Sequence, residues 1–142
     1  MSTDENKDLV RRFEEGMLEA LRTGNLPDSL QDTVDPDCAF GMPGMPSTLE
    51  GMRQMLPAFR TAFSDMQVRV GEMIAEGDKV AYHLTVTATH TGEFMGVPAT
   101  GKHVTFTETH IDQIAGGKIV RHDGDWDQVS MLQQLGVIPA MG

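Results

Sequence analysis

Two side chains that can move protons lie near each other in the last third of the chain. His110 falls in a strand-like run over 105–114, and Asp127 ends the next such run, over 118–127. A short turn, Ala115-Gly116-Gly117, joins the runs, so we expect two adjacent antiparallel strands. A carboxylate and an imidazole among apolar neighbours are the groups that a small acid/base enzyme requires.

Alternation along the first run places polar and apolar side chains on one face. Val104, Phe106, Glu108 and His110 all occupy even positions. This mixture favours a partly polar cavity over a solvent-exposed face. Burial raises the pKa of a carboxylic acid and lowers that of a histidine, which moves both toward the range of a general acid or base. The alternatives are a core histidine bonded to backbone and a surface ion pair for Glu108.

Asp127 has two rivals and a second possible role. Alternation places Asp123, Asp125 and Asp127 on one face of the last strand, unless Gly124 introduces a bulge. Asp127 also precedes a helical pattern over 129–135, and an aspartate there commonly caps the first N–H groups of a helix. Spacing alone leaves the choice among the three aspartates open.

Other kinds of chemistry find less support in the sequence. All five histidines lie in the second half of the chain, but no His-Glu-x-x-His motif, helical histidine pair or cysteine cluster occurs. We therefore expect no metal site. The single cysteine, Cys38, lies in no nucleophile motif, and no phosphate-binding or dinucleotide fingerprint is present.

Composition limits the classes of partner. A chain of 142 residues with 39% hydrophobic and 23% charged residues is typical of one soluble globular domain, which we expect to span 1–142. The net charge of −10 argues against binding to nucleic acid or to anionic membranes. The N-terminus is polar, and no window approaches the roughly 20 apolar residues of a membrane span, so we expect a cytoplasmic protein. The eleven methionines either fill core gaps, the simpler interpretation, or line an adaptable apolar pocket.

The elements that must position the candidate groups begin with helices. An apolar stripe that repeats every four residues from Leu9 to Leu21 predicts an amphipathic helix, with Gly24 at its end. A shorter helical piece over 26–34 and a brief strand over 36–40 follow. The next helix starts at Ser47 or Thr48, and Pro57 should kink or divide it.

Beyond Asp65 the apolar period changes from nearly four to two, which is typical of strands. In the clearest strand, 80–91, the even positions from Tyr82 to Ala88 share an apolar face. The expected strands cover 66–76, 80–91, 102–114 and 118–127. Helices first and an antiparallel meander after them indicate an α+β fold.

Three segments carry a resemblance to a known family: 89–102, Gly117-Lys-Ile-Val-Arg-His122, and Leu132-Gln-Gln-Leu-Gly136. On these segments the chain resembles the SnoaL-like polyketide cyclase (ester cyclase) family over nearly its whole length. That family is similar in fold to nuclear transport factor 2 and to ketosteroid isomerase. The resemblance implies a cone-shaped, curved antiparallel sheet wrapped by the N-terminal helices, an α+β barrel with an apolar pocket inside.

The resemblance also implies roles for single residues. It selects Asp127 as the acid/base of an intramolecular aldol closure of a polyketide ester ring, with His110 assisting, and it implies no metal or organic cofactor. If so, Asp127→Asn should abolish turnover and leave the thermal midpoint nearly unchanged. The further residues that we expect to line the substrate pocket are Phe40, Met55, Phe59, Phe94, Val104, Phe106, Glu108, His122 and Trp126.

The leading functional hypothesis is therefore a cofactor-free acid/base enzyme that acts on an apolar carbonyl compound, in its sharpest form an aldol-type cyclase of the lyase or isomerase kind. Alternatives on the same pocket are an isomerase, an epoxide hydrolase or a non-catalytic small-molecule-binding module. We also expect a homo-oligomer, a dimer or tetramer, which would bury the open sheet face that carries Thr85, Thr87 and Thr89.

Overall fold

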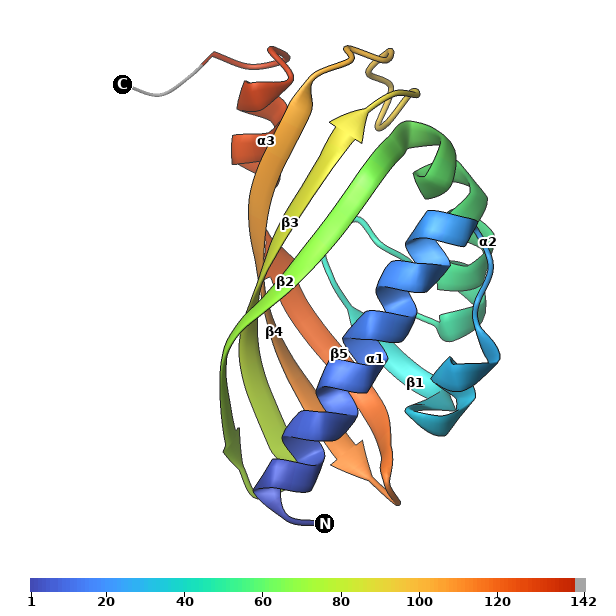
Figure 1. Ribbon diagram of the computed structural model, residues 1–142, viewed down its shortest axis with the longest axis vertical. Coiled ribbons are helices and arrows are strands. Elements are labelled where there is room, and N and C mark those ends of the chain that lie inside the picture. The colour runs from blue at the N-terminus through green and yellow to red at the C-terminus, as the bar shows by residue number, and fades with distance from the viewer. Residues whose placement is uncertain (140–142) are drawn as a thin grey trace.

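The computed structural model of the protein describes residues 1–139. Within this range a curved five-stranded sheet wraps around helix α1, and helix α2 lies beside α1 over the same concave face (Figure 1). The elements in chain order are α1 (Thr3–Thr23), a 3-10 turn η1 (Asp28–Asp32), β1 (Val34–Gly41), α2 (Leu49–Ala62), β2 (Phe63–Glu76), β3 (Lys79–His90), β4 (His103–Ala115), β5 (Lys118–Trp126) and α3 (Gln128–Gln134). The predicted α+β fold with a curved sheet and an internal pocket is confirmed.

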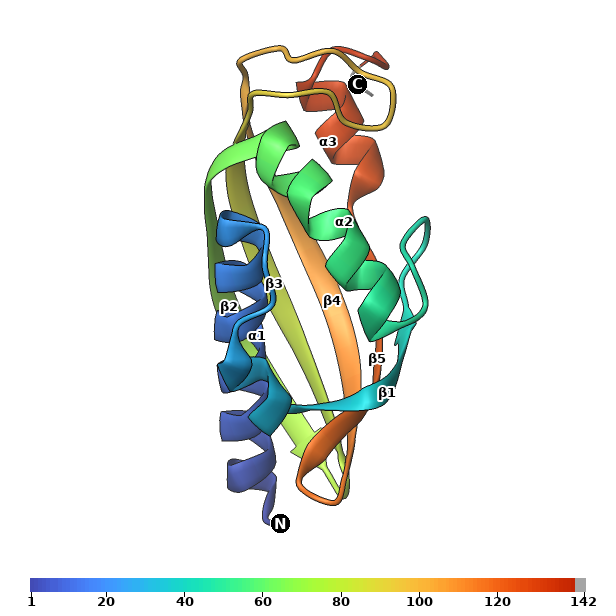
Figure 2. The same ribbon diagram turned by 90° about the vertical axis from the view of Figure 1, so that its right-hand side faces the viewer.

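The sheet has the order β1-β5-β4-β3-β2. Strands β2 to β5 form the predicted antiparallel meander, but β1 pairs with β5 in parallel. The sheet is therefore mixed and not wholly antiparallel, because the chain passes through α2 and the whole meander before β5 returns beside β1. In Figure 2, β1 runs across the lower front of the molecule, below α2.

The boundaries of α1 follow from its terminal residues. Ser2 accepts a hydrogen bond from the N–H of Glu5, whose side chain accepts one from the N–H of Ser2, and this capping box satisfies two donors that the first turn leaves free. The N-cap of α1 is therefore Ser2. Gly24 ends the helix as expected, with a left-handed φ of 81° that glycine adopts at little cost.

Helix α2 begins after Thr48, one of its two expected caps, whose side chain accepts from the N–H of Gly51. It continues through Pro57 to Ala62, so the expected division of this helix does not occur. Pro57 lies on the exposed side, where the loss of one backbone donor leaves a carbonyl near solvent and not in the core.

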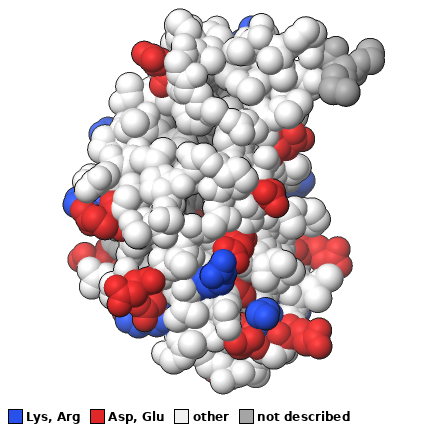
Figure 3. Space-filling model, turned by 180° about the vertical axis from the view of Figure 1, so that it is seen from behind, with Lys and Arg blue, Asp and Glu red and all other residues white. Residues whose placement is uncertain are grey.

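Strand β3 follows the expected alternation. Tyr82, Leu84 and Val86 are buried on the concave side, whereas Thr85 and Thr87 lie on the outer face of the sheet. Acidic side chains gather mainly on the lower half of the surface opposite to the view of Figure 1, with several basic side chains among them (Figure 3). No helix within residues 1–139 is long and apolar enough to cross a membrane.

Candidate active site

A largely apolar pocket lies between the two long helices and the concave face of the sheet. The empty space in the pocket, together with solvent at its open mouth, is about 910 Å³. Six of the eleven methionines line it, which supports the interpretation of these residues as pocket lining: Met17, Met42, Met45, Met52, Met66 and Met131. Flexible thioether side chains suit a bulky apolar ligand. The titratable side chains at its wall are Glu14, Glu108, His110 and His122.

Most residues that the sequence assigns to the pocket do line it. They are Phe40, Phe59, Phe94, Phe106, Glu108, His110, His122 and Trp126. Met55 and Val104 are not among the lining residues. Val104 has the expected orientation, but it packs under α3 with Met131 and Leu135 in a core cluster. Met55 lies half-buried on α2, one residue before the fully buried Leu56.

The three aspartates near the end of β5 lie away from the pocket. His122 and Trp126 face the cavity, so the odd positions between and after them take the opposite face. Asp127 is exposed and caps α3, and its Oδ1 accepts from the N–H of Ser130 at 3.0 Å. The structure thus shows the N-cap role that the sequence left open, while a catalytic role for Asp127 stays a prediction.

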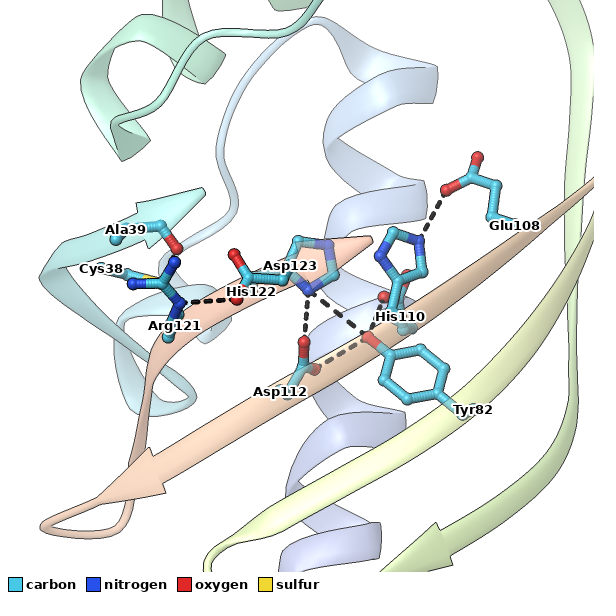
Figure 4. Close-up of polar contacts among 10 residues, drawn as sticks. Cys38, Ala39, Tyr82, Glu108, His110, Asp112, Arg121, His122 and Asp123 are labelled. Carbon is cyan, nitrogen blue, oxygen red and sulfur yellow. Dashed lines mark hydrogen bonds and ion pairs between the residues drawn. The ribbon is translucent and has the colours of Figure 1, made fainter. Parts of the chain in front are cut away.

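The polar wall of the pocket contains two histidine–carboxylate pairs, drawn in Figure 4. Nδ1 of His122 lies 2.5 Å from Oδ1 of Asp112, and Nε2 of His110 lies 2.7 Å from Oε1 of Glu108. The two imidazole rings are stacked, with centroids 4.3 Å apart and planes 18° from parallel. The stack requires Gly124, which pairs with His110 across the strands: a Cβ there would lie 2.2 Å from Nδ1 of His110.

Tyr82 connects these pairs to helix α1. Its hydroxyl lies 2.7 Å from Oε1 of Glu14 and 2.8 Å from Oδ2 of Asp112, and Nδ1 of His122 is a longer contact at 3.5 Å. The resulting network joins α1, β3, β4 and β5 below the apolar part of the pocket.

Sequence reasoning missed three members of this network: Glu14, Tyr82 and Asp112. The sequence contains a signal for two of them, Asp112 and Glu14. Asp112 is the next even position of β4 after His110, and in the structure it is completely buried. Glu14 lies four residues after Val10 and four before Leu18, so it interrupts the apolar stripe of α1.

The electrostatics of the network follow from burial and contact. Burial raises the pKa of Glu14, although His122, His110 and the hydrogen bond with Tyr82 oppose the rise. Burial also raises the pKa of Tyr82 well above its ordinary value, and the neighbouring Glu14 and Asp112 add to this. Burial alone would lower the pKa of His122, but the charge and hydrogen bond of Asp112, with smaller contributions from the other neighbouring acidic side chains, outweigh it, and the pKa of His122 is raised.

One group within residues 1–139 has the composition of a metal site. Candidate ligand atoms of Glu14, His110 and His122 lie within 4.8 Å of one another. The rings of the two histidines are nearly parallel, so their in-plane lone pairs run side by side and do not converge on one point. We interpret the group as a hydrogen-bond network, and the expectation of no metal cofactor stays a prediction.

Cys38 is buried on β1, and its surroundings make it a poor nucleophile. Burial, together with the charges of Asp112, Asp35 and Asp123, raises the pKa of its thiol to about 12. A thiol with so high a pKa supplies almost no thiolate at neutral pH. This geometry agrees with the lack of a nucleophile motif in the sequence.

Comparison with known proteins identifies the family. The family described as SnoaL-like polyketide cyclase matches residues 9–135. The protein belongs to the SnoaL-like polyketide cyclase family. This membership supports a polyketide cyclase role in general terms.

Individual proteins of known sequence or structure are also similar to this chain. Aklanonic acid methyl ester cyclase DauD of Streptomyces sp. (strain C5) is 31% identical over 136 residues, which are 91% of this chain and 80% of the relative. AclR of Streptomyces galilaeus, described as a candidate hydroxylase, is 30% identical with a TM-score of 0.81 over 99% of this chain and 87% of its own. IdmH of Streptomyces antibioticus, described as a candidate polyketide cyclase, is 31% identical with a TM-score of 0.75 over 92% and 98% of the two chains.

Proposed function

We propose that the protein is a cofactor-free polyketide cyclase that closes a ring by an intramolecular aldol reaction on an apolar polyketide ester. The observation that supports this proposal best is the presence of two histidine–carboxylate pairs, with different hydrogen-bond patterns, at one wall of an apolar pocket. In this assignment Glu108 is the general base and His122 is the general acid. His110 positions the base, and Asp112 positions the acid.

The hydrogen bonds of His110 support a carboxylate at Glu108. Nδ1 of His110 is buried with no hydrogen-bond partner within the described chain, so a proton there would be an unsatisfied buried donor. Buried N–H groups without an acceptor are rarer than under-satisfied acceptors. The proton therefore belongs on Nε2, which donates to Oε1 of Glu108. Glu108 is then an oriented anion, and its side chain retains 18% exposure at the pocket wall.

The surroundings of His122 support the opposite role. Its Nδ1–H donates to Asp112, a fully buried carboxylate, and Asp112 raises the pKa of the imidazole. Nε2 has no protein partner among the described residues, and His122 lines the pocket. An imidazolium held in this way can donate from Nε2 to an oxygen of the bound ligand.

In the proposed reaction Glu108 and His122 each transfer one proton. Glu108 removes a proton from the carbon next to a carbonyl, and the resulting enolate attacks a second carbonyl carbon of the same molecule. The oxygen of that carbonyl becomes an alkoxide and takes the proton from Nε2 of His122. Proton return from Glu108 to His122 through solvent restores the enzyme. The apolar walls strengthen these charge interactions because they exclude water.

The pocket wall favours a flat apolar substrate. Phe59, Phe63 and Phe94 form a cluster in which Phe94 lies 4.9 Å from Phe63 and 5.6 Å from Phe59 between ring centroids. Aromatic faces and methionines suit an unsaturated polyketide skeleton. The name of DauD specifies aklanonic acid methyl ester, and we propose a substrate of the same class for this protein.

Glu108→Gln tests the assignment of the base. It keeps an acceptor for His110 but removes the charge, and we expect kcat on aklanonic acid methyl ester to fall by about 10²–10⁴ with little change in the thermal midpoint. Asp127→Asn is the matched carboxylate-to-amide control outside the pocket, for which we expect a much smaller loss. Full activity of the Glu108 variant, or loss of turnover by the folded Asp127 variant, would instead favour Asp127 as the base.

The same assay separates the alternative reactions. An aldol closure gives an isomer of the substrate, whereas the hydroxylation named for AclR would add an oxygen atom to the mass. An isomerase would act on ketone panels and an epoxide hydrolase on epoxide panels. Tight ligand binding without any product in these assays would indicate a binding module.

A further inference from the structure

The hydroxyl of Tyr82 makes two short contacts that cannot both exist between ionised groups. Oε1 of Glu14 and Oδ2 of Asp112 lie 2.7 Å and 2.8 Å from it. A phenol has one proton to donate, and an ionised carboxylate can only accept. If both acids were anions, one of these oxygen–oxygen contacts would contain no proton and would be repulsive. One of the two carboxyl groups must therefore be protonated.

Of the two carboxyl groups, Asp112 is the one whose contacts favour the ionised form. Its Oδ1 accepts from Nδ1–H of His122 at 2.5 Å, and its Oδ2 accepts from Tyr82. Two donors, one of them cationic when His122 is protonated, stabilise the ionised form. Glu14 has Tyr82 as its single hydrogen-bond partner within the described residues. Burial acts on Glu14 in the same sense, because it raises the pKa of this carboxyl group.

We propose that Glu14 is a positioning residue that remains protonated during turnover and, through Tyr82, fixes Asp112 as the anion that holds His122 in its acid form. The hydrogen bonds then run in one direction: Glu14 donates to Tyr82, Tyr82 donates to Asp112, and His122 donates to Asp112. Every oxygen–oxygen and nitrogen–oxygen contact in this series of hydrogen bonds contains one proton.

The groups that face Glu14 come from three strands. Tyr82 lies on β3, Asp112 and His110 lie on β4, and His122 lies on β5. The anion among them, Asp112, opposes a second negative charge at Glu14. Above its raised pKa Glu14 would lose its proton and could no longer donate to Tyr82, so this chain of hydrogen bonds should break as the pH rises through that pKa.

This inference rests on the proposed function only for its effect on turnover, since the protonation state can be measured without substrate. Glu14→Gln replaces the acid with a neutral donor of the same shape. Difference infrared spectra of wild type and variant at neutral pH should show the C=O stretch of one protonated carboxylic acid, which the variant lacks. Glu15→Gln, an exposed neighbour on α1, is the matched control and should leave this band in place. Tyr82→Phe should shift the band without removing it, because the acid loses its acceptor.

Two further measurements connect the proton to His122. In NMR titrations the pKa of His122 should be equal in wild type and Glu14→Gln, because one neutral group replaces another; loss of an anion would lower it. Glu14→Leu, which cannot donate to Tyr82, should reduce kcat by about tenfold, and Glu14→Gln should recover most of that loss. Absence of the acid band in wild type, or a lower His122 pKa in Glu14→Gln, would overturn the proposal. A protein that shows the band but closes no polyketide ring would overturn only the proposed function.

Discussion

Asp112→Asn is the substitution that tests most directly how the buried pair positions His122. Asp112 is completely buried and accepts from both His122 and Tyr82. The amide has one acceptor oxygen in place of two, so one of these donors must face an N–H₂ group. Hydrogen bonds to charged groups contribute about 1.5–3 kcal/mol each. We expect the variant to lose roughly 2–3 kcal/mol of unfolding free energy, or about 10 °C in thermal midpoint.

The pH dependence of this loss has a definite sign. The folded-state pKa of His122 is raised above its unfolded value, chiefly by Asp112 against the opposing effect of burial. A raised pKa contributes stability that is fully present below the unfolded value and is lost as the pH rises through the folded value. The difference in unfolding free energy between wild type and Asp112→Asn should therefore be larger at about pH 5.5 than at about pH 9.

Urea unfolding at both pH values measures this difference. Asp123→Asn is a suitable control, since it breaks the exposed Arg121–Asp123 pair, whose side chains are 57% and 40% exposed. Such a surface pair should contribute no more than about 1 kcal/mol. The alkaline limb of kcat should also move to lower pH in Asp112→Asn, because His122 loses the anion that keeps it protonated. Equal stability of wild type and Asp112→Asn at both pH values would refute the role assigned to the pair.

Two other predictions concern the sheet. Gly124→Ala should cost about 1–3 kcal/mol and lower kcat, because its Cβ would displace the His110 ring, whereas Gly71→Ala, with ordinary contacts at 3.5 Å, should change little in urea unfolding and turnover. We also propose that the outer sheet face, which carries Thr85, Thr87 and the half-exposed Ile111, pairs two copies of the chain. Light scattering should then give a dimer mass that Ile111→Arg reduces to a monomer; a monomeric wild type would contradict this proposal.

The periodic parts of the fold were predictable because one physical rule decided each of them. The four-residue stripe of α1 and the alternation of β3 reflect burial of one face, which the sequence records directly. No pattern in the sequence indicates that β1 pairs with β5 in parallel. This pairing joins segments about eighty residues apart, and the alternation of a short strand is the same in either direction.

In the candidate site, too, residues that follow a local pattern were predictable, and residues whose position depends on the rest of the fold were not. Alternation on β4 indicated Glu108 and His110, and one further step along the same face reaches Asp112. The position of Asp127 depended on which face of β5 turns inward, and the three aspartates alone could not show that. His122 and Trp126 decide it, since their large rings fill the concave side and leave the odd positions to solvent.

Glu14 differs from these residues because its partners lie on strands more than sixty positions away. The sequence marks it only as a charged residue within the apolar face of a helix, and such a residue can be a surface interruption or a buried acid. The docking of α1 on the sheet decides between the two, because it places the carboxyl group against Tyr82 and Asp112. When two buried acids share one hydroxyl, one of them must retain a proton, so the charge state of this group follows from the packing of α1 and not from any catalytic motif.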